Sequence, residues 1–221
     1  DLRQSRQEAT LREWIEALPQ ALLTNRPVLA LGLVGARMAI GDFTGVVALL
    51  DDIERVVDPI VHDPVEYARV PAQASMYRAA LALLHGDLGA TIEHATYAAA
   101  LSGDDHLGRG AAIALTGLAE WTSADLDAST RQYALAIEEF EAAQYYADIL
   151  GCTLGLADMY VAQGRLDDAQ RLLSDRLRWA AQHGALRGTP DLHVALAEIH
   201  LERNELDAAA DEIATSRSFG E

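Results

Sequence analysis

Apolar residues recur along the chain as helical stripes that are separated by short polar turns. Two stripes flank Gly164, and each has apolar side chains three or four positions apart. They comprise Leu154, Ala157, Tyr160 and Val161 before the glycine, and Leu166, Ala169, Leu172, Leu173 and Leu177 after it. This spacing places the apolar side chains on one face of each helix. The pattern predicts a helical hairpin in which Gly164 takes the positive φ that ends the first helix.

The hairpin pattern is repeated at a nearly constant interval. Residues 156–176 read LADMYVAQGRLDDAQRLLSDR, and residues 196–216 read LAEIHLERNELDAAADEIATS. Aligned turns occur at Gly41, Gly86, Ala124, Gly164 and Asn204, at intervals of 86−41 = 45, 124−86 = 38, 164−124 = 40 and 204−164 = 40 residues. Five such turns predict an all-α fold, a right-handed superhelix of stacked antiparallel hairpins with about 10–12 helices. Because no low-complexity linker interrupts the repeats, we expect residues 1–221 to form a single domain.

Small residues mark the positions where paired helices should cross closely. Ala157 and Ala169 occupy these positions around Gly164, and Ala197 and Ala209 occupy them in the last unit. At the second position the earlier units carry Val46, Thr91 and Ser129. With an aromatic residue between them and a glycine at the turn, these small residues resemble the tetratricopeptide (TPR) pattern. A period near 40 instead of about 34 implies longer helices than in the standard repeat.

Prolines divide the array into its segments. The apolar stripe of the first predicted helix consists of Leu11, Trp14, Ile15 and Leu18. Pro19 should stop that helix, and Pro27 suits the first turn of the next one. The face that carries Trp14 has no upstream partner, so we expect that it met a preceding repeat in a longer protein. The segment from Asp58 to Pro71 holds three prolines and predicts a longer connection, with the following helix beginning around Pro71.

Charge and composition exclude several classes of partner. Half of the residues are hydrophobic, and the net charge is −17 with a pI near 4.6. Such a surface repels phosphate groups, so we expect no direct contact with nucleic acid and no docking on anionic membranes. No apolar run approaches the roughly 18 residues that a bilayer span requires. Cys152 is the single cysteine and cannot form an internal disulfide, which favours a reducing, cytoplasmic environment.

The sequence contains no recognisable catalytic motif. It lacks a glycine-rich phosphate loop followed by Lys-Ser/Thr, and it lacks the G-x-S-x-G and H-E-x-x-H patterns. His193 and His200 are spaced i, i+7 on one predicted helix, which is a weak metal signal that packing or surface roles explain better. Helix capping explains the Asp-Asp-His run at 104–106. Cys152 has no evident histidine partner, and we expect no enzymatic activity, metal or cofactor.

Six residues are candidates for a ligand or partner groove. They are Arg69, Arg78, Arg109, Tyr145, Tyr146 and Tyr160. Arg78 and Arg109 lie within or beside apolar helical segments, where they could recognise an anionic or hydroxyl-rich ligand. The alternative is that these arginines form interior ion pairs or cap carbonyl groups. The tyrosine rings could stack on a sugar or a peptide, or they could pack between helices.

Longer phrases resemble a known family. LREWIEALPQALLTNRPVLAL, at residues 11–31, resembles the R-W-L-x-A-L-P…R-P-x-L segment in the helical-repeat region of large ATP-dependent regulators of the LuxR type, the MalT-type regulators. Later units of that region are similar to GDLGATIEHATYAAAL, DDHLGRGAAIALTGLAEW, LADMYVAQGRLDDAQRLL and LAEIHLERNELDAAADEI. The resemblance implies a superhelical sensor region within a multidomain protein, with a nucleotide-binding module upstream and often a helix-turn-helix downstream.

Three hypotheses follow for the function. The first is a non-catalytic sensor and interaction domain of a LuxR/MalT-type transcriptional regulator, which binds a protein partner or a small-molecule effector in its concave groove and thereby biases self-association of the full-length protein. The second is a protein-docking scaffold attached to a kinase or cyclase module, because related repeats also occur beside such modules. The third is an independent enzyme, which would need converging reactive groups that the sequence does not show.

Overall fold

A computed structural model describes residues 8–18, 23, 26–56, 67–184 and 187–219 of the chain. Across these residues it contains eleven helices and no strand, so the predicted all-α class and the predicted number of helices are confirmed. Contacts divide the chain into two compact units, Asp1–Leu115 and Thr116–Glu221. Each unit is built from neighbouring antiparallel helices that share an apolar core.

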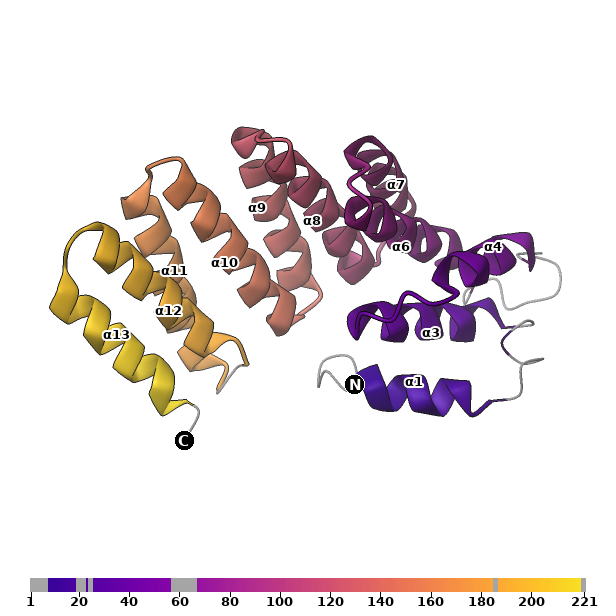
Figure 1. The fold of residues 1–221 in the computed structure, drawn as a ribbon, viewed down its shortest axis with the longest axis horizontal. Helices are drawn as coiled ribbons and strands as arrows, with labels where there is room; N and C mark the ends of the chain where they lie inside the picture. Colours follow the sequence, from indigo (N-terminus) through magenta and orange to yellow (C-terminus); the bar gives the residue numbers. More distant parts are fainter. Residues whose placement is uncertain (1–7, 19–22, 24–25, 57–66, 185–186, 220–221) are drawn as a thin grey trace. The chain divides into compact units, whose positions relative to one another are not determined.

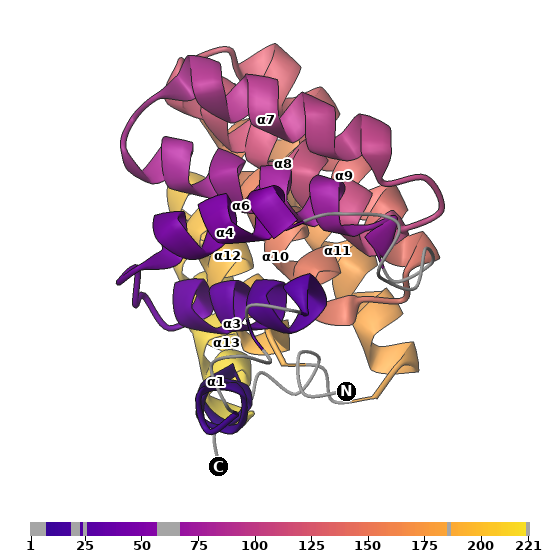
Figure 2. The same cartoon turned by 90° about the vertical axis from the view of Figure 1, so that its right-hand side faces the viewer.

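Within its described residues, the first unit contains five complete helices. They are α1 (Glu8–Glu16), α3 (Pro27–Ala39), α4 (Val46–Val56), α6 (Val70–Leu84) and α7 (Leu88–Leu101). Helix α3 contacts α1, α4 and α6, and α6 pairs with α7, so that elements adjacent in sequence are adjacent in space (Figure 2). The main core of this unit joins α3, α4 and α6 and includes the fully buried Leu31, Val34 and Leu50.

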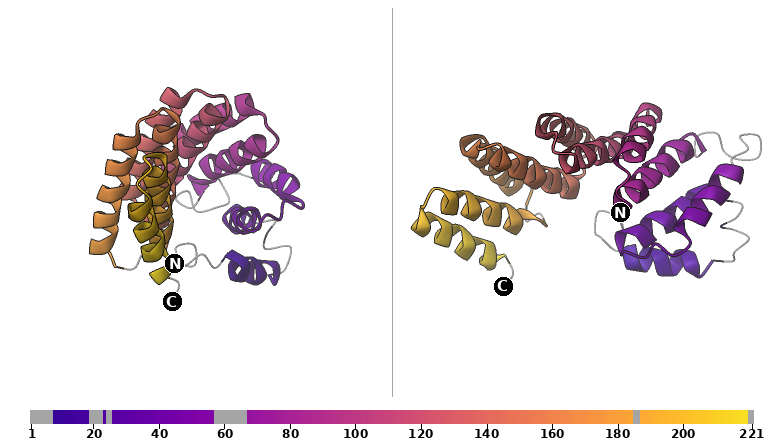
Figure 3. Two further views of the ribbon diagram at one scale, coloured as in Figure 1. Left: turned by 60° about the vertical axis from the view of Figure 1, so that its left-hand side comes forward. Right: turned by 45° about the horizontal axis from the view of Figure 1, so that its top comes forward.

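The second unit contains the hairpins around the last three predicted turns. Helix α8 (His106–Thr122) crosses the boundary between the units, and then come α9 (Leu126–Ala142), α10 (Tyr146–Ala162), α11 (Leu166–Gln182), α12 (Thr189–Glu202) and α13 (Leu206–Ser218). Helix α10 contacts α9, α11 and α12, and α12 also contacts α11 and α13. The orange and yellow helices α10–α13 therefore lie side by side (Figures 1 and 3). Their core includes Leu173, Leu192 and Ile199.

All five predicted turn residues adopt the left-handed conformation. Their φ values are 78° at Gly41, 75° at Gly86, 65° at Ala124, 72° at Gly164 and 58° at Asn204. In every case the next N–H donates to a carbonyl five residues back, as in a Schellman motif. These bonds are Asp42 to Arg37 at 2.9 Å, Asp87 to Ala82 at 2.9 Å, Asp125 to Glu120 at 2.9 Å, Arg165 to Tyr160 at 2.8 Å and Glu205 to His200 at 2.8 Å. The predicted turn register is therefore confirmed.

The predicted crossing positions are buried in every unit. Around the last two turns, the exposed fractions are 1% for Ala157, 0% for Ala169, 1% for Ala197 and 4% for Ala209. The residues at the second position of the earlier units, Val46, Thr91 and Ser129, are fully buried. The polar side chains among them are hydrogen-bonded. For example, the Ser129 hydroxyl donates a hydrogen bond to the Gly117 carbonyl at 2.7 Å. Burial at these positions therefore persists although the residue type changes from one unit to the next.

The helix boundaries agree with the prolines where the structure describes them. Helix α3 begins at Pro27, and α6 begins at Val70 with Pro71 in its first turn. Helix α1 ends at Glu16, whereas Pro19 and residues 57–66 of the predicted long connection lie outside the described residues. On α1 the apolar stripe divides, because Ile15 is buried and Trp14 is 60% exposed.

Candidate functional site

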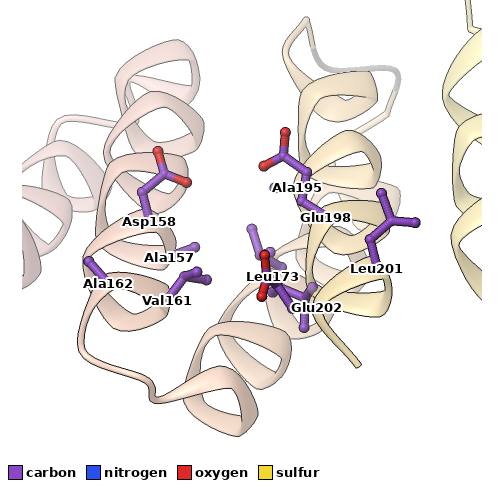
Figure 4. A pocket seen from close by; sticks show the side chains of 10 residues that line it. Ala157, Asp158, Val161, Ala162, Leu173, Ala195, Glu198, Leu201 and Glu202 are labelled. Carbon is purple, nitrogen blue, oxygen red and sulfur yellow. The ribbon is translucent and has the colours of Figure 1, made fainter. Parts of the chain in front are cut away.

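A groove of about 380 Å³ lies between α10 and α12 in the second unit (Figure 4). Helix α11 closes its base, where Leu173 lies between the two walls. The buried part of the lining is apolar, and Ala157, Leu173 and Ile199 are at most 1% exposed. Val161 and Ala162 continue the α10 wall, with Ala195 and Leu201 on α12. This volume falls in the lower part of the range for ligand sites in proteins.

Three carboxylates line the same groove. Asp158 belongs to α10, and Glu198 and Glu202 belong to α12, one helical turn apart. Figure 4 shows Asp158 and Glu198 at the same level on opposite walls, and Glu202 pointing toward the space between the helices. The groove therefore combines an apolar base with a negatively charged rim.

The electrostatics of the rim are unfavourable to a further negative charge. Although Asp158 is an exposed residue, partial burial of its carboxyl beside the apolar wall raises its pKa, and the negative charge of Glu198 raises it further. Both causes disfavour the ionised form of the carboxyl group. A cation placed between the two walls would remove this repulsion.

The three groove carboxylates have no cationic partner among the described residues, unlike six other acids of this unit. Among the residues that the structure describes, the side chains of Asp158, Glu198 and Glu202 make no hydrogen bond or ion pair. Elsewhere in the unit arginine and histidine neutralise six carboxylates. These pairs are Arg176 with Glu141, Arg203 with Asp167, Arg165 and Arg171 with Asp168, Arg178 with Asp175, His193 with Glu212 and His200 with Glu205.

Two of these carboxylates belong to a repeated position. In the last two units an acidic residue directly follows the buried alanine of the first crossing position. The pairs are Ala157-Asp158 on α10 and Ala197-Glu198 on α12, at an interval of 198−158 = 40 residues. A third acid, Glu120 on α8, lies two residues closer to its turn. Burial raises the pKa of Glu120 as it does for Asp158, and the nearby Asp125 raises it further. One carboxyl oxygen of Glu120 is buried without a hydrogen-bond partner among the described residues.

Arg78, one of the six sequence-predicted site residues, joins two helices. Its guanidinium donates to both carboxyl oxygens of Glu54, at 2.7 and 2.8 Å, and to Asp51 at 2.7 Å. The hydrogen bonds to Glu54 are the main cause of a raised pKa, which keeps Arg78 charged. This geometry corresponds to the ion-pair alternative and connects α6 to α4.

Arg69 and Arg109 also have partners within the first unit. Arg69 forms an ion pair with Asp104 at 3.8 Å, and both side chains are largely exposed. The guanidinium of Arg109 donates to the carbonyl of Gly103 and lies 2.9 Å from Nδ1 of His106. Arg109 thereby caps the turn that precedes α8, as in the carbonyl-capping alternative. A ligand-binding role for the three arginines stays a prediction.

The three predicted tyrosines lie at the ends of α10. Tyr145 is its N-cap residue and is half buried. The ring of Tyr146 packs edge-on against Trp179 at 5.4 Å and against His183 at 5.3 Å. Tyr160 lies under the guanidinium of Arg165, 4.2 Å from its ring centroid. None of the six predicted residues belongs to the lining of the groove between α10 and α12, and their part in binding stays a prediction.

The remaining candidates take structural positions. The carboxylate of Asp105 accepts from the Gly108 N–H at 3.1 Å and caps α8, which confirms the predicted capping role of this run. His193 and His200 each bond a glutamate at 2.6 Å, and no cluster of three metal-binding side chains occurs among the described residues. Cys152 is buried, and burial raises the pKa of its thiol to about 12. That pKa keeps the sulfur in its weakly reactive thiol form.

The groove residues were missed from sequence because they look like ordinary exposed acids. Asp158 and Glu198 stand on the polar side of amphipathic helices, where charged residues are common. The available signal was their register: each follows the small residue that places two helices in close contact. An acid at that position in two successive units is adjacent to the helix crossing.

The chain was compared with known proteins. A family model described as the MalT-like TPR region matches residues 72–216, which begins after the 11–31 phrase of the predicted resemblance. No curated protein matches the chain. In the described part of the chain, no helix combines the length and the apolar character that crossing a membrane requires.

Several solved structures share the fold. BtubC (BKLC) from P. vanneervenii has a TM-score of 0.71 at 14% identity, covering 99% of this chain and 91% of that one. A putative kinesin light chain of Podosopora anserina with nearly identical TPR-like repeats has a TM-score of 0.65 at 15% identity, with coverages of 89% and 96%. The apo form of RapI has a TM-score of 0.68 at 9% identity, with coverages of 87% and 69%. At these identities the likeness concerns the fold, a TPR-like helical solenoid.

Proposed function

The chain belongs to the family of MalT-like TPR regions, and on that premise we propose that it is a non-catalytic interaction domain that binds a protein partner in the groove between α10 and α12. The observation that carries the proposal is the groove itself. Its base is apolar, whereas three rim carboxylates have no intrachain partner. Helical repeats commonly use the surface between stacked units for recognition.

The lining chemistry supports binding over catalysis. The groove is lined by aliphatic side chains and carboxylates alone, without a hydroxyl, thiol, imidazole or amine. A hydroxyl, thiol or amine nucleophile with an adjacent base, one arrangement for covalent catalysis, is therefore missing from the residues that line it. Apolar contact area surrounded by charged groups is instead typical of a protein-docking surface.

The family supports a place for this domain within a larger regulator. We infer that binding in the groove biases the self-association of a full-length LuxR/MalT-type transcriptional regulator, which requires that the partner bind two states with different affinity. A helix-turn-helix encoded downstream in the same reading frame is the expected finding. A neighbouring kinase or cyclase module would instead favour the docking-scaffold alternative.

A blocking substitution tests the groove directly. Ala162 is an exposed residue on the α10 wall, so Ala162→Trp fills the groove without disturbing the core. Ala210 on α13 is exposed and lies outside the groove, which makes Ala210→Trp a matched control. Peptides selected from a random display library on the wild-type chain should lose binding to Ala162→Trp and keep binding to Ala210→Trp. Equal binding to both variants would contradict the proposal.

A further inference from the structure

We infer that the groove between α10 and α12 selects a cationic amphipathic segment of a partner protein, with aliphatic side chains against Leu173 and Ile199 and lysine or arginine between Asp158 and Glu198. This inference rests on the proposed docking function and specifies the chemistry of its partner. It combines the apolar base of the groove with the charge complementarity of its rim.

The apolar part of the groove accounts for the aliphatic side chains. Leu173 and Ile199 form its base, and Val161 and Ala195 form partly exposed walls. An aliphatic side chain that enters this space removes apolar surface from water at about 25 cal/mol per Å². Amphipathic helices dock in this way, with an apolar stripe in a hydrophobic groove.

The rim accounts for the basic residues. Asp158 and Glu198 stand on opposite walls, and the charge of Glu198 raises the cost of ionising Asp158 in the absence of a cation. A guanidinium or ammonium group between them would donate hydrogen bonds to both carboxylates, and Glu202 would add a third carboxylate one turn further along α12. An acidic segment would meet like charge at every one of these positions, which costs binding energy.

The charge of the second unit acts in the same direction over a longer range. Between residues 116 and 221 there are 19 acidic and 8 basic side chains, so this unit carries −11 of the total charge of −17. A field of this sign attracts basic segments before contact and repels acidic ones, and added salt weakens both effects. The specific part of the selection is assigned to the groove, because three carboxylates converge there beside an apolar base, whereas other acids without an ion pair, such as Glu138 and Asp211, lie outside it.

The test uses matched peptides and matched variants. The first probe is a synthetic amphipathic peptide with leucine along one face and lysine on both flanks, labelled with a fluorophore. A second peptide replaces every lysine by glutamate. The groove variant is Asp158→Asn with Glu198→Gln, and the control variant is Glu138→Gln with Asp211→Asn, which removes the same charge from exposed positions on α9 and α13. Fluorescence anisotropy gives the affinities.

We expect the lysine peptide to bind the wild-type chain and to lose about tenfold in affinity on the groove variant, as two carboxylate contacts are removed. The control variant should lose less than about twofold, through the weaker long-range field. Equal losses on the two variants would overturn the inference, because binding would then depend on net charge alone. Absence of binding by the lysine peptide would overturn it as well.

The glutamate peptide separates this inference from the proposed function. If it binds the wild-type chain as tightly as the lysine peptide and Ala162→Trp blocks it, the groove is a docking site but does not select cations. If either peptide binds and Ala162→Trp changes nothing, the docking function fails together with the inference. Tight binding of the lysine peptide alone, lost on Ala162→Trp, supports both.

Chemical crosslinking identifies which carboxylates of this chain contact the lysines of the peptide. The sequence contains no lysine, since all 17 basic residues are arginine. A carbodiimide activates a carboxylate, and a lysine amine of the peptide then displaces the urea and forms an amide. If the peptide is amidated at its C-terminus, every lysine amide therefore joins a carboxylate of this chain to the peptide. Peptide mapping should place these amides on Asp158, Glu198 or Glu202, and amides confined to α9 and α13 would contradict the inference.

Discussion

The ring of Tyr133 on α9 packs directly against Gly155 on α10, with no room for a β-carbon between them. A Cβ placed on Gly155 would lie 2.6 Å from Cε1 of Tyr133, and a Cβ on Gly117 of α8 would lie 2.7 Å from Cδ2 of the same ring. Tyr133 is buried, and the two glycines confine its ring on both edges. Three consecutive helices of the second unit therefore approach each other through one aromatic ring.

Substituting this glycine should destabilise the second unit. We expect Gly155→Ala to lower the free energy of unfolding by about 1–3 kcal/mol, because the new methyl group overlaps a ring that cannot move aside. Gly151 is one turn away on the same helix, and a Cβ there meets nothing within 4 Å. Gly151→Ala should raise stability by about 0.5–1 kcal/mol through helix propensity. Urea unfolding of both variants checks the opposite signs, and equal effects would contradict the close approach.

The turn at Ala124 should gain stability from glycine. Ala124 has a φ of 65°, in a region where residues with a β-carbon are strained by about 1–2 kcal/mol. Ala124→Gly should therefore raise the unfolding free energy by about 0.5–1 kcal/mol, after allowing for the greater freedom of glycine in the unfolded chain. The reciprocal change, Gly164→Ala at the next turn, should lower it by a similar amount. Thermal unfolding measures both, and a loss on Ala124→Gly would count against the turn geometry.

Stability should respond to pH with opposite signs at two aspartates. The pKa of Asp158 is raised by partial burial and by Glu198, so its ionised form opposes folding at neutral pH. As the pH falls through that raised pKa, the carboxyl is protonated and this cost disappears. Asp158→Asn should therefore stabilise the chain at neutral pH by up to about 0.5 kcal/mol, because the exposed rim screens much of the effect. The difference in the free energy of unfolding between Asp158→Asn and the wild type should become smaller in acid.

Asp168 provides the contrasting case. Its pKa is lowered, first by the hydrogen bond from Arg165, so its stabilising contribution is present at neutral pH and lost as the pH falls through the folded-state pKa. Asp168→Asn should lower stability at neutral pH and have little effect in acid. Unfolding curves for both variants across this range measure the two slopes. If the effect of both substitutions on the free energy of unfolding changed with pH in the same direction, the ionised Asp158 carboxylate would not be destabilising.

Removing Arg78 should weaken the first unit. Arg78→Met keeps much of the side-chain volume but leaves Glu54 and Asp51 without their shared cation. We expect a loss of about 1 kcal/mol, since the pairing is bidentate but partly exposed to solvent. The combined variant Arg78→Met with Glu54→Gln should lose less than the two single variants together. Additive losses would show that the ion pair contributes nothing.

Cys152 should react slowly in the folded chain. Its thiol is buried, and its pKa is raised to about 12, so both access and thiolate formation are suppressed. Alkylation by iodoacetamide at mildly alkaline pH should be at least about tenfold slower for the folded chain than in denaturant. Mass spectrometry follows the reaction. Equal rates would indicate that α10 opens readily at this position.

The repeat architecture could be predicted from sequence because its turns obey local rules. The residue type alone predicts a left-handed conformation at Gly41, Gly86 and Gly164. The common period extends that prediction to Ala124 and Asn204. Local rules do not determine which neighbouring helix an exposed arginine or tyrosine side chain contacts. Arg78 pairs with two acids on α4, a contact that depends on how α4 packs on α6.

Predicting the groove from sequence would have required the same kind of non-local information. Asp158 and Glu198 are 40 residues apart in sequence, 198−158 = 40, and they come together only because α10 and α12 are neighbours. Neither residue type is unusual on a helix surface. What distinguishes them in the structure is that they face each other across an apolar groove without a cationic partner, a property of three-dimensional placement.

Each hairpin of this protein closes through its own hydrogen bond between residues five apart, formed within the segment that it shapes. The turn geometry of a unit is therefore determined by residues of that unit, whatever its place in the array. A gene segment that encodes one hairpin could be duplicated in frame and would bring its turn geometry with it. Such a chain can lengthen, and diversify its groove one unit at a time, without renewed selection for the shape of every other unit.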